Sequence, residues 1–381
     1  MVNGEKFHLF VSCAPELEPL LVEELKELGV EAPRPGYRGV YVDDWDWSTI
    51  YTINYASRLA SRVLLPIARF KCFHRTSLYE KAYEIDWSRY LKPNWTFAID
   101  ANVNHRELRN SLFAAQVVKD AICDQMRHKT GRRPSVQLQD PDLQINLFIQ
   151  QQIAVISFDT SGTPLHKRGY RQETVEAPMQ ETLAAAILRL ARYRSDAVLL
   201  DPCCGSGTLL IEAALLATQT PPGYLRQQWG FMQHMAYDNL EWLRVKNHWD
   251  AKRIPLQPHH LFGVDLSKSA VRATKINLRA AGFQQQVEVV EGDFRDYQPS
   301  VAPTLIVTNP PHGRRLEEED QLHSLYRALG DFFKKKAATP AQGFIFTGNL
   351  ELAKEIGLAA KRRYVLNNGG VDSRLLEFDL Y

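Results

Sequence analysis

The sequence AVLLDPCCGSGTLLIEAA, residues 197–214, decides the fold of the second half of the chain. Its apolar start ends on Asp201, and a loop of small residues follows, with Gly205 and Gly207 in it. Apolar residues then recur at the three- and four-residue spacing of one helix face. Glycine permits positive φ and lets the backbone come close to a ligand. The stretch therefore predicts a strand, a ligand-binding turn and a helix starting near Thr208, whose free N–H groups favour polar or anionic ligand atoms.

Three kinds of nucleotide-binding loop compete for this turn. A phosphate-binding loop is rejected because no lysine follows Gly207. A dinucleotide-binding loop is disfavoured because Leu210 stands where a third glycine would allow close packing of helix on strand. The remaining interpretation is a class I methyltransferase loop, in which Asp201, Pro202 and Thr208 also contact S-adenosylmethionine. An ordinary strand-to-helix turn without a ligand is the alternative.

A second apolar strand leads into the tetrapeptide Asn309-Pro310-Pro311-His312 within LIVTNPPHG, residues 305–313. Asn or Asp, two prolines and an aromatic residue form the active-site signature of methyltransferases that modify a nitrogen conjugated to a ring or carbonyl. The lone pair of such a nitrogen is delocalised, so the amine has to be held by its hydrogens. Asn309 Oδ1 and the carbonyl of Pro310 can accept those two hydrogen bonds. A plain loop in which the prolines only end the strand is the alternative.

Length and composition set the general class of the protein. A chain of 381 residues exceeds one usual core, so we expect two or three domains. A charged fraction of 24% and a hydrophobic fraction of 45% are ordinary for a globular protein. No secretory leader or membrane-length apolar window is visible, which predicts a cytoplasmic location without membrane contact. The five cysteines are scattered and lack CxxC spacing, so we expect neither disulfides nor a metal site.

The first half of the chain reads as two consecutive α+β units. Strands at 6–13, 39–42 and 61–70 with helices at 17–28 and 48–57 predict a small ferredoxin-like module that ends near Cys72. The second unit has helical patterns at 79–85 and 87–91, a strand at 95–103, a long amphipathic helix at 112–127 and a hairpin of strands 143–149 and 152–159.

Basic residues gather in several short clusters. Each cluster alone is most often a solvated face. Clusters that converge on the catalytic side would instead form a track for a phosphate backbone. The residues expected to contact RNA in this way are Lys129, Arg132, Arg133, Lys167, Arg168, Arg171, Arg314 and Arg315.

The order of parts resembles that of known RNA-modifying enzymes. A helix, a basic loop and an edge hairpin upstream of a methyltransferase pattern resemble a THUMP domain, an RNA-binding module, preceded by its ferredoxin-like partner. The junction LHKRGYR, residues 165–171, and APMQETLAAA, residues 177–186, are similar to the segment that enters the catalytic domain of bacterial 23S rRNA guanine-N2 methyltransferases of the RlmL kind and the YpsC-like group. The resemblance implies domains at 1–72, 73–163 and 164–381.

Further residues are expected around the cofactor. Asp265 ends a strand at 261–264, a position that suits hydrogen bonds to both ribose hydroxyls. Asp293 could accept the adenine amino group and Phe294 could flank the ring, although ordinary loop structure explains both equally well. Thr182 lies on a helix that could cover the cofactor, and helix packing explains it equally.

Two segments of the catalytic half remain. The insertion at 220–260 carries Trp229, Trp242 and Trp249, which either stack on a base or pack a helical insert. The final segments 364–368 and 375–381 predict the terminal antiparallel hairpin of a Rossmann-like class I methyltransferase sheet.

Together the motifs and the resemblance imply an S-adenosylmethionine-dependent RNA methyltransferase acting on the exocyclic N2 of a guanosine, with 23S rRNA as the expected substrate. Direct in-line transfer needs neither a metal nor a covalent enzyme intermediate. His312 departs from the tyrosine usual in this family, which weakens the expected stacking on the base. The alternatives are a tRNA guanine-N2 methyltransferase, an N6-adenine methyltransferase, and a noncatalytic RNA-binding or ribosome-assembly protein. Oligomeric state cannot be read from the sequence.

Overall fold

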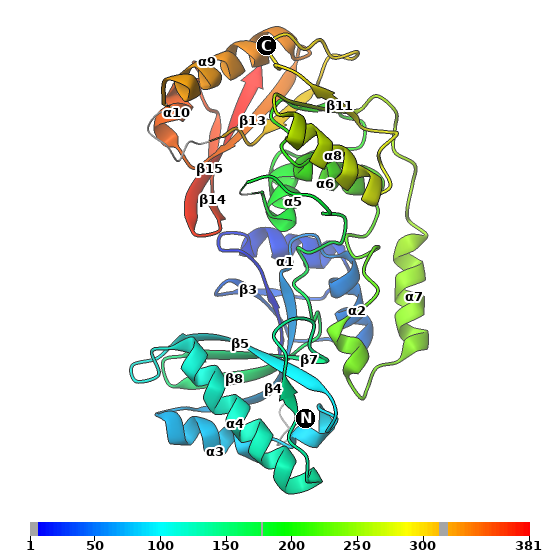
Figure 1. The fold of residues 1–381 in the computed structure, drawn as a ribbon. Helices are drawn as coiled ribbons and strands as arrows, with labels where there is room; N and C mark the ends of the chain where they lie inside the picture. The colour runs from blue at the N-terminus through cyan, green and yellow to red at the C-terminus, as the bar shows by residue number, and fades with distance from the viewer. Residues whose placement is uncertain (1–6, 177, 312–318) are drawn as a thin grey trace. The chain divides into compact units, whose positions relative to one another are not determined.

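The computed structural model describes residues 7–176, 178–311 and 319–381, so the predicted site residues His312, Arg314 and Arg315 lie outside the described residues. The chain divides into two compact units (Figure 1). The first contains Leu21–Leu165 and Arg226–Lys246 together with the N-terminal strand. The second contains His166–Leu225 and Asn247–Tyr381 together with Ala14–Leu20. A segment late in the sequence therefore belongs to the first unit.

The described residues of the first unit form one eight-stranded sheet in the order β2-β3-β1-β4-β8-β7-β5-β6. The two predicted α+β modules share this sheet, because β4 pairs antiparallel with β8 from Leu64↔Asp159 to Lys71↔Ile153. The predicted hairpin is β7 and β8, but the expectation that it lies at an edge is wrong: β5 covers its other side. The strands are β1 (Leu9–Ser12), β2 (Arg34–Gly36), β3 (Gly39–Val42), β4 (Arg62–Lys71), β5 (Thr96–Asn104), β6 (Ser135–Val136), β7 (Leu143–Gln150) and β8 (Ile153–Asp159).

Local capping explains where the helices of this part of the chain begin and end. Asp46 accepts a hydrogen bond from Thr49 N at 2.7 Å and completes a capping box. Gly131, with φ 72°, supplies the left-handed residue that ends the long helix. The pattern at 87–91 is a short 3-10 turn, Trp87–Arg89, rather than a full helix. The helices are α1 (Glu18–Glu27), α2 (Trp47–Ala56), α3 (Arg75–Glu84) and α4 (Ser111–Thr130).

Two tryptophans of the insertion pack inside the first unit. Trp229 and Trp242 are 3% and 5% exposed. The ring of Trp242 lies 5.4 Å from that of Tyr55 on α2, edge to face, and Trp229 stacks on Phe231 at 5.6 Å. Burial excludes these two rings from stacking on a base here, so the packing interpretation is correct for them. Trp249, on α7 (Asn239–Asp250), is only partly buried, with Lys252 Nζ 3.7 Å from its ring centre.

The described residues of the second unit form a seven-stranded sheet in the order β11-β10-β9-β12-β13-β15-β14. The first five strands are parallel, and β15 runs antiparallel to both β13 and β14. The predicted class I methyltransferase fold with its terminal antiparallel hairpin is thus confirmed. The strands are β9 (Leu199–Asp201), β10 (Leu261–Asp265), β11 (Glu288–Glu291), β12 (Leu305–Thr308), β13 (Ala341–Thr347), β14 (Arg362–Asn368) and β15 (Val371–Leu380).

The helices of the second unit include α5 (Glu181–Leu190), α6 (Thr208–Ala217), α8 (Lys268–Ala280), α9 (Glu319–Lys336) and α10 (Leu350–Lys354). Because the chain enters at β9 and later strands add on both of its sides, the order reverses there. Ligands of such sheets bind outside the carboxyl ends of the strands at this point. A membrane-spanning helix needs a long apolar stretch, and none of the helices in the described parts of the chain provides one.

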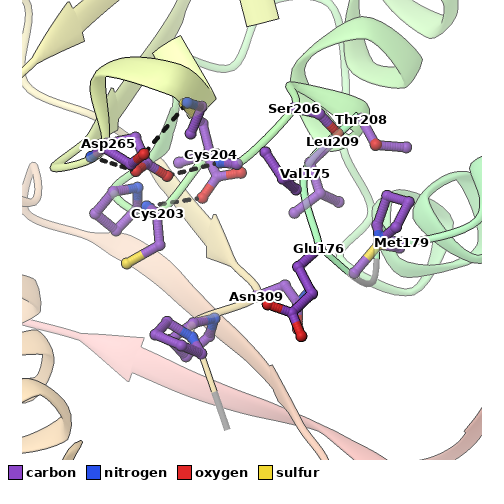
Figure 2. Close-up of a pocket in the computed structure, with 18 of the residues that line it drawn as sticks. Val175, Glu176, Met179, Cys203, Cys204, Ser206, Thr208, Leu209, Asp265 and Asn309 are labelled. Atoms are coloured by element: carbon purple, nitrogen blue, oxygen red, sulfur yellow. Dashed lines mark hydrogen bonds between the residues drawn. The ribbon is translucent and has the colours of Figure 1, made fainter. Parts of the chain in front are cut away.

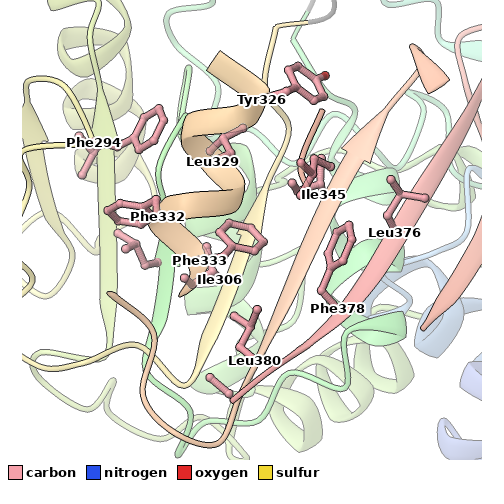
Figure 3. Close-up of a cluster of buried hydrophobic side chains, with 14 of the residues drawn as sticks. Phe294, Ile306, Tyr326, Leu329, Phe332, Phe333, Ile345, Leu376, Phe378 and Leu380 are labelled. Carbon is pink, nitrogen blue, oxygen red and sulfur yellow. The ribbon is translucent and has the colours of Figure 1, made fainter. Parts of the chain in front are cut away.

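The core between α9 and the sheet fixes the position of β12 (Figure 3). Phe333 is fully buried, and a Cβ on Gly343 of β13 would lie 2.5 Å from its ring, so the glycine allows helix and strand to approach. Ile306 of β12 belongs to the same buried cluster. Each large apolar side chain buried here contributes about 1.5–3 kcal/mol. The residue that follows β12 is therefore held by a well-packed support.

Candidate active site

One pocket of about 1380 Å³ lies at the carboxyl ends of β9, β10 and β12 (Figure 2). Its lining includes Asp201, Gly205, Asp265 and Asn309. The structure thus brings the glycine loop and the Asn-Pro-Pro motif to one cavity. Pro202, Thr208, Asp293, Phe294, Pro310 and Pro311 also line it, whereas Gly207 and Thr182 are not among its lining residues.

The glycine loop is fixed by its backbone conformation and by neighbouring elements. Gly205 and Gly207 have φ of 56° and 82°, in the left-handed region. A Cβ on Gly207 would lie 2.7 Å from Thr274 Cγ2 of α8. Thr274 Oγ1 donates to the carbonyl of Gly205 at 2.7 Å. The loop therefore requires glycine at 207 and is held against α8.

Asp265 connects the end of β10 to this loop. Its Oδ2 accepts from Gly205 N at 2.8 Å and its Oδ1 accepts from Ser267 N at 2.9 Å. Burial raises the pKa of the Asp265 carboxyl above its usual value. A carboxylate offers about four acceptor positions. Lone pairs consequently remain for the ribose hydroxyls that the sequence analysis assigns to Asp265.

Asp201 joins the two strand ends that carry the motifs. Its carboxyl group is 1% exposed and accepts from Thr308 Oγ1 at 2.8 Å and from Cys203 N at 3.2 Å. Burial raises the pKa of Asp201 to about 7, and the charge of Asp265 acts in the same direction. Since Thr308 directly precedes Asn309, this hydrogen bond links the end of β9 and the glycine loop that follows it to the strand that precedes the Asn-Pro-Pro motif.

Asn309 offers an unused acceptor. Its Oδ1 is buried and has no hydrogen-bond partner in the described parts of the chain. Leaving a buried polar atom unsatisfied costs about 1–3 kcal/mol. The neighbouring Pro310 is buried and Pro311 is exposed. The arrangement fits an incoming N–H donor at Asn309.

The pocket also suits a cationic ligand. Five acidic residues and one arginine are found among the described lining residues: Glu173, Glu176, Asp201, Asp265, Asp293 and Arg295. The sulfonium of S-adenosylmethionine is positively charged, so this balance fits that cofactor. Arg295 does not strongly oppose the binding of a cation, because the charge of Arg295 is balanced by a neighbouring carboxylate.

That carboxylate belongs to Asp293. Arg295 Nε donates to Asp293 Oδ1 at 2.8 Å, and the pair holds the pKa of Asp293 below its usual value. Phe294 is 5% exposed and packs edge to face on Phe332 at 5.3 Å. The acceptor role of Asp293 and the flanking role of Phe294 stay predictions, with these internal contacts competing for both side chains.

The pocket wall made by residues 173–176, 178 and 179 was not expected from the sequence, whereas Gln180 beside it was expected near the cofactor, and all of them line the pocket. The buried amide of Asn277 holds the start of this wall. Its Oδ1 accepts from Gln172 N at 2.8 Å, and its Nδ2 donates to the carbonyls of Glu173 and Ser206 at 2.8 and 3.0 Å. An asparagine on the buried face of an amphipathic helix is the one signal that could have pointed to it.

The predicted RNA contacts differ in exposure. Lys129, Arg132, Arg133 and Lys167 are exposed, and Lys129 also pairs with Asp86 at 2.7 Å. Arg168 is 2% exposed and lies 3.5 Å from the buried Glu212. The side chain of Arg171 is 20% exposed and pairs with Glu181. The internal contacts of Arg168 and Arg171 argue against a phosphate contact for these two.

Fold and site together define a class I methyltransferase with a pocket that fits S-adenosylmethionine. Family models agree with this class and add the front half of the chain. The model described as "RMKL-like, methyltransferase domain" matches residues 168–377, "THUMP domain" matches 75–159, and "RlmL ferredoxin-like domain" matches 8–64. The chain belongs to the RMKL-like methyltransferase family, and the resemblance expected from the sequence is confirmed.

Curated relatives agree over nearly the whole chain. "Ribosomal RNA large subunit methyltransferase K/L" of Syntrophotalea carbinolica is 40% identical over 97% of this chain and 53% of the relative. "Putative RNA methyltransferase slr0064" of Synechocystis is 36% identical over 98% of this chain and 96% of the relative. The chain thus spans about half the length of the K/L relatives it matches.

Solved structures share the full architecture. SMU.472, described as "a putative methyltransferase complexed with SAH", superposes with a TM-score of 0.86 at 27% identity, and the match covers 98% of each chain. A protein of Listeria monocytogenes described as a predicted N6-adenine-specific DNA methylase superposes with a TM-score of 0.85 at 27% identity, over 98% of this chain and 96% of that one.

Proposed function

We propose that this protein transfers a methyl group from S-adenosylmethionine to the exocyclic N2 of a guanosine in RNA, with large-subunit ribosomal RNA as its substrate. The observation that carries the proposal is the buried, unpartnered Oδ1 of Asn309 at a pocket shared with the glycine loop. The THUMP match and the K/L relatives support an RNA substrate, and 23S rRNA is the specific substrate we propose.

The mechanism follows from where the acceptors lie. Bound S-adenosylmethionine would supply a methyl group activated by a sulfonium; the sulfur-to-methyl bond would break as N2 bonds to the methyl carbon, S-adenosylhomocysteine would be the leaving group, and N2 would release one proton. Asn309 Oδ1 and the carbonyl of Pro310 accept hydrogen bonds from the two hydrogens on N2, which turns the lone pair of that nitrogen toward the methyl. Catalysis depends on positioning, because the two fixed acceptors, Asn309 Oδ1 and the carbonyl of Pro310, hold the amine in line with the methyl group. The guanine has to leave its stack to reach the pocket, whose volume of about 1380 Å³ is large for a single ligand.

Glu176 supports guanine over adenine. It lines the pocket, and Figure 2 shows its side chain pointing toward Asn309. A carboxylate accepts hydrogen bonds but cannot donate them. Guanine presents N–H donors at both N1 and N2, whereas N1 of adenine is an acceptor and is repelled by a carboxylate. Adenine N6 remains the second candidate, because the same tetrapeptide suits that amine and one similar structure carries such a description.

Transfer of labelled methyl groups to 23S rRNA, tRNA and DNA in parallel tests the proposal. We expect incorporation into 23S rRNA, recovered as N2-methylguanosine after digestion to nucleosides. The variant Glu176→Ala should lower kcat/KM for this RNA by about tenfold or more, the effect of losing a hydrogen bond to a charged group, and Glu176→Gln, which keeps one acceptor oxygen without the charge, should lower it less. Recovery of N6-methyladenosine, or transfer to DNA alone, would contradict the proposal.

Domain boundaries at residues 72 and 163 and a cytoplasmic location are further parts of this proposal. The exposed Lys129, Arg132, Arg133 and Lys167 are the residues for which we retain a phosphate contact. tRNA is the alternative substrate, and its modification in the parallel assay would replace rRNA in the proposal without changing the chemistry at Asn309.

A further inference from the structure

Arg171 forms hydrogen bonds to four residues in and around the glycine loop. Its Nε donates to Glu181 Oε1 at 2.9 Å, and its Nη1 donates to Ser206 Oγ at 3.2 Å. Its Nη2 donates to Thr208 Oγ1 at 3.1 Å and to the carbonyl of Met179 at 2.8 Å. One guanidinium therefore ties the wall at 178–180 to the loop and to the first residue of α6.

These hydrogen bonds determine whether the two hydroxyl groups act as donors or as acceptors. Arginine has only donors, so Ser206 and Thr208 accept its hydrogen bonds with their oxygen lone pairs. Each hydroxyl then keeps its own hydrogen for another acceptor, and the described residues provide none by hydrogen-bond geometry. Ser206 and Thr208 are 4% and 6% exposed, and both line the pocket. The two O–H groups are thus available as donors to a ligand.

The backbone beside these hydroxyls offers donors of the same kind. Gly207 is the N-cap of α6 and has no side chain to cap it, and no hydrogen bond from the first amides of the helix is seen among the described residues. Open amides at a helix start favour an anion. Glu181 balances the charge of Arg171, so Arg171 acts here by directing hydrogen bonds rather than by adding net charge.

We propose that Arg171 is a positioning residue that converts the hydroxyls of Ser206 and Thr208 into donors for the carboxylate of the methionine part of the cofactor. Among the charged side chains of the described lining, five carboxylates stand against one arginine, and these carboxylates would repel that group. The inference reassigns Arg171, which the sequence places in a basic cluster, from a phosphate contact to cofactor binding. It rests on the use of S-adenosylmethionine by this pocket.

Two ligands that differ only in the amino-acid part test the proposal. S-adenosylhomocysteine carries the carboxylate, and 5′-methylthioadenosine has the adenosine and the thioether without it. By titration calorimetry, Arg171→Met should weaken S-adenosylhomocysteine about tenfold or more and change methylthioadenosine less than about twofold. Arg171→Lys, which keeps a donor, should recover part of the loss. Arg194→Met is the matched control, since the side chain of Arg194 is 80% exposed, and it should leave both affinities unchanged.

Thr208→Val covers the case in which Arg171→Met does not fold, because it keeps the shape of the side chain and removes only the hydroxyl. It should reproduce the selective loss of S-adenosylhomocysteine. Equal weakening of both ligands in folded variants, or no weakening of either, would overturn the role of Arg171. A wild-type protein that binds neither ligand would instead contradict the cofactor assignment itself.

Discussion

Two walls of the pocket lining contrast with each other: the glycine-loop wall with Asp201 and Asp265, and the β12 wall with Asn309. They differ in how many of their polar side-chain groups have hydrogen-bond partners within the protein. On the glycine-loop wall, Asp265 accepts from two backbone amides and Asp201 from Thr308 and Cys203. On the wall at the end of β12, Asn309 Oδ1 is buried without a partner among the described residues. The difference supports the proposal that the side assigned to the cofactor is built in advance and that the substrate base completes the other side. Changes on the two walls should therefore affect different steps.

The largest effect is expected at the β12 wall. Asn309→Ala should lower kcat for RNA methylation by about 10²–10³-fold, because a fixed acceptor for the reacting amine is removed. Affinity for S-adenosylhomocysteine should change less than about twofold. Asn309→Asp keeps an acceptor oxygen and should retain more activity than the alanine variant. Steady-state kinetics with separate calorimetry checks this, and a parallel loss of cofactor affinity would erase the contrast between the walls.

At the loop wall, Asp265→Ala should raise the KM for S-adenosylmethionine about 10–100-fold, since charged hydrogen bonds to the ribose and to Gly205 N are both lost. At saturating cofactor, kcat should stay close to that of the wild type. Asp265→Asn preserves one acceptor oxygen and should show a smaller rise. A drop in kcat with unchanged KM would place Asp265 on the catalytic side instead.

The exposed basic residues lie outside both walls and should affect neither. Alanine at Lys129, Arg132 and Arg133 together should weaken RNA binding about tenfold at physiological salt and flatten its salt dependence, as expected for lost phosphate contacts. Filter binding over a salt series measures this. Affinity for S-adenosylhomocysteine should remain that of the wild type. An unchanged salt dependence would remove these residues from the RNA interface.

The smallest effect concerns Asp201, which connects the walls. Its pKa is raised from 3.8 to about 7, so between these values the folded protein holds a proton that the unfolded chain releases. The contribution of Asp201 to stability is therefore fully present below about pH 4, declines as pH rises toward 7 and stays constant above. Asp201→Asn should remove a change in unfolding free energy of about 1 kcal/mol between pH 6 and pH 7. Urea titrations of both proteins measure it, and identical pH profiles would contradict the assigned pKa.

The site could be predicted where its residues sit in short motifs at strand ends. Asp201 and Asp265 each end an apolar strand and Asn309 directly follows one, and the carboxyl ends of parallel strands share one edge of a sheet. Local pattern also gave the terminal hairpin, because β14 and β15 are neighbours in sequence. In these cases local signals and the global fold agree.

The other features of the fold and site could not be predicted, because they depend on contacts between residues far apart in the sequence. Nothing in the sequence distinguishes the exposed Lys167 from the buried Arg168, because exposure is set by where Glu212 of α6 lies. The role of Arg171 depends likewise on Ser206 and Thr208, more than thirty residues away. The sequence predicts an edge position for the hairpin because it gives no sign that β8 pairs with β4, about ninety residues away, or that β7 pairs with β5.

A structure of the protein with bound S-adenosylhomocysteine tests the central claim most directly. We expect the ribose at Asp265, the amino-acid carboxylate at Ser206 and Thr208, and the sulfur facing Asn309 across the pocket. A ligand bound elsewhere, or one whose sulfur is turned away from Asn309, would contradict the claim that one pocket joins the methyl donor to the target amine.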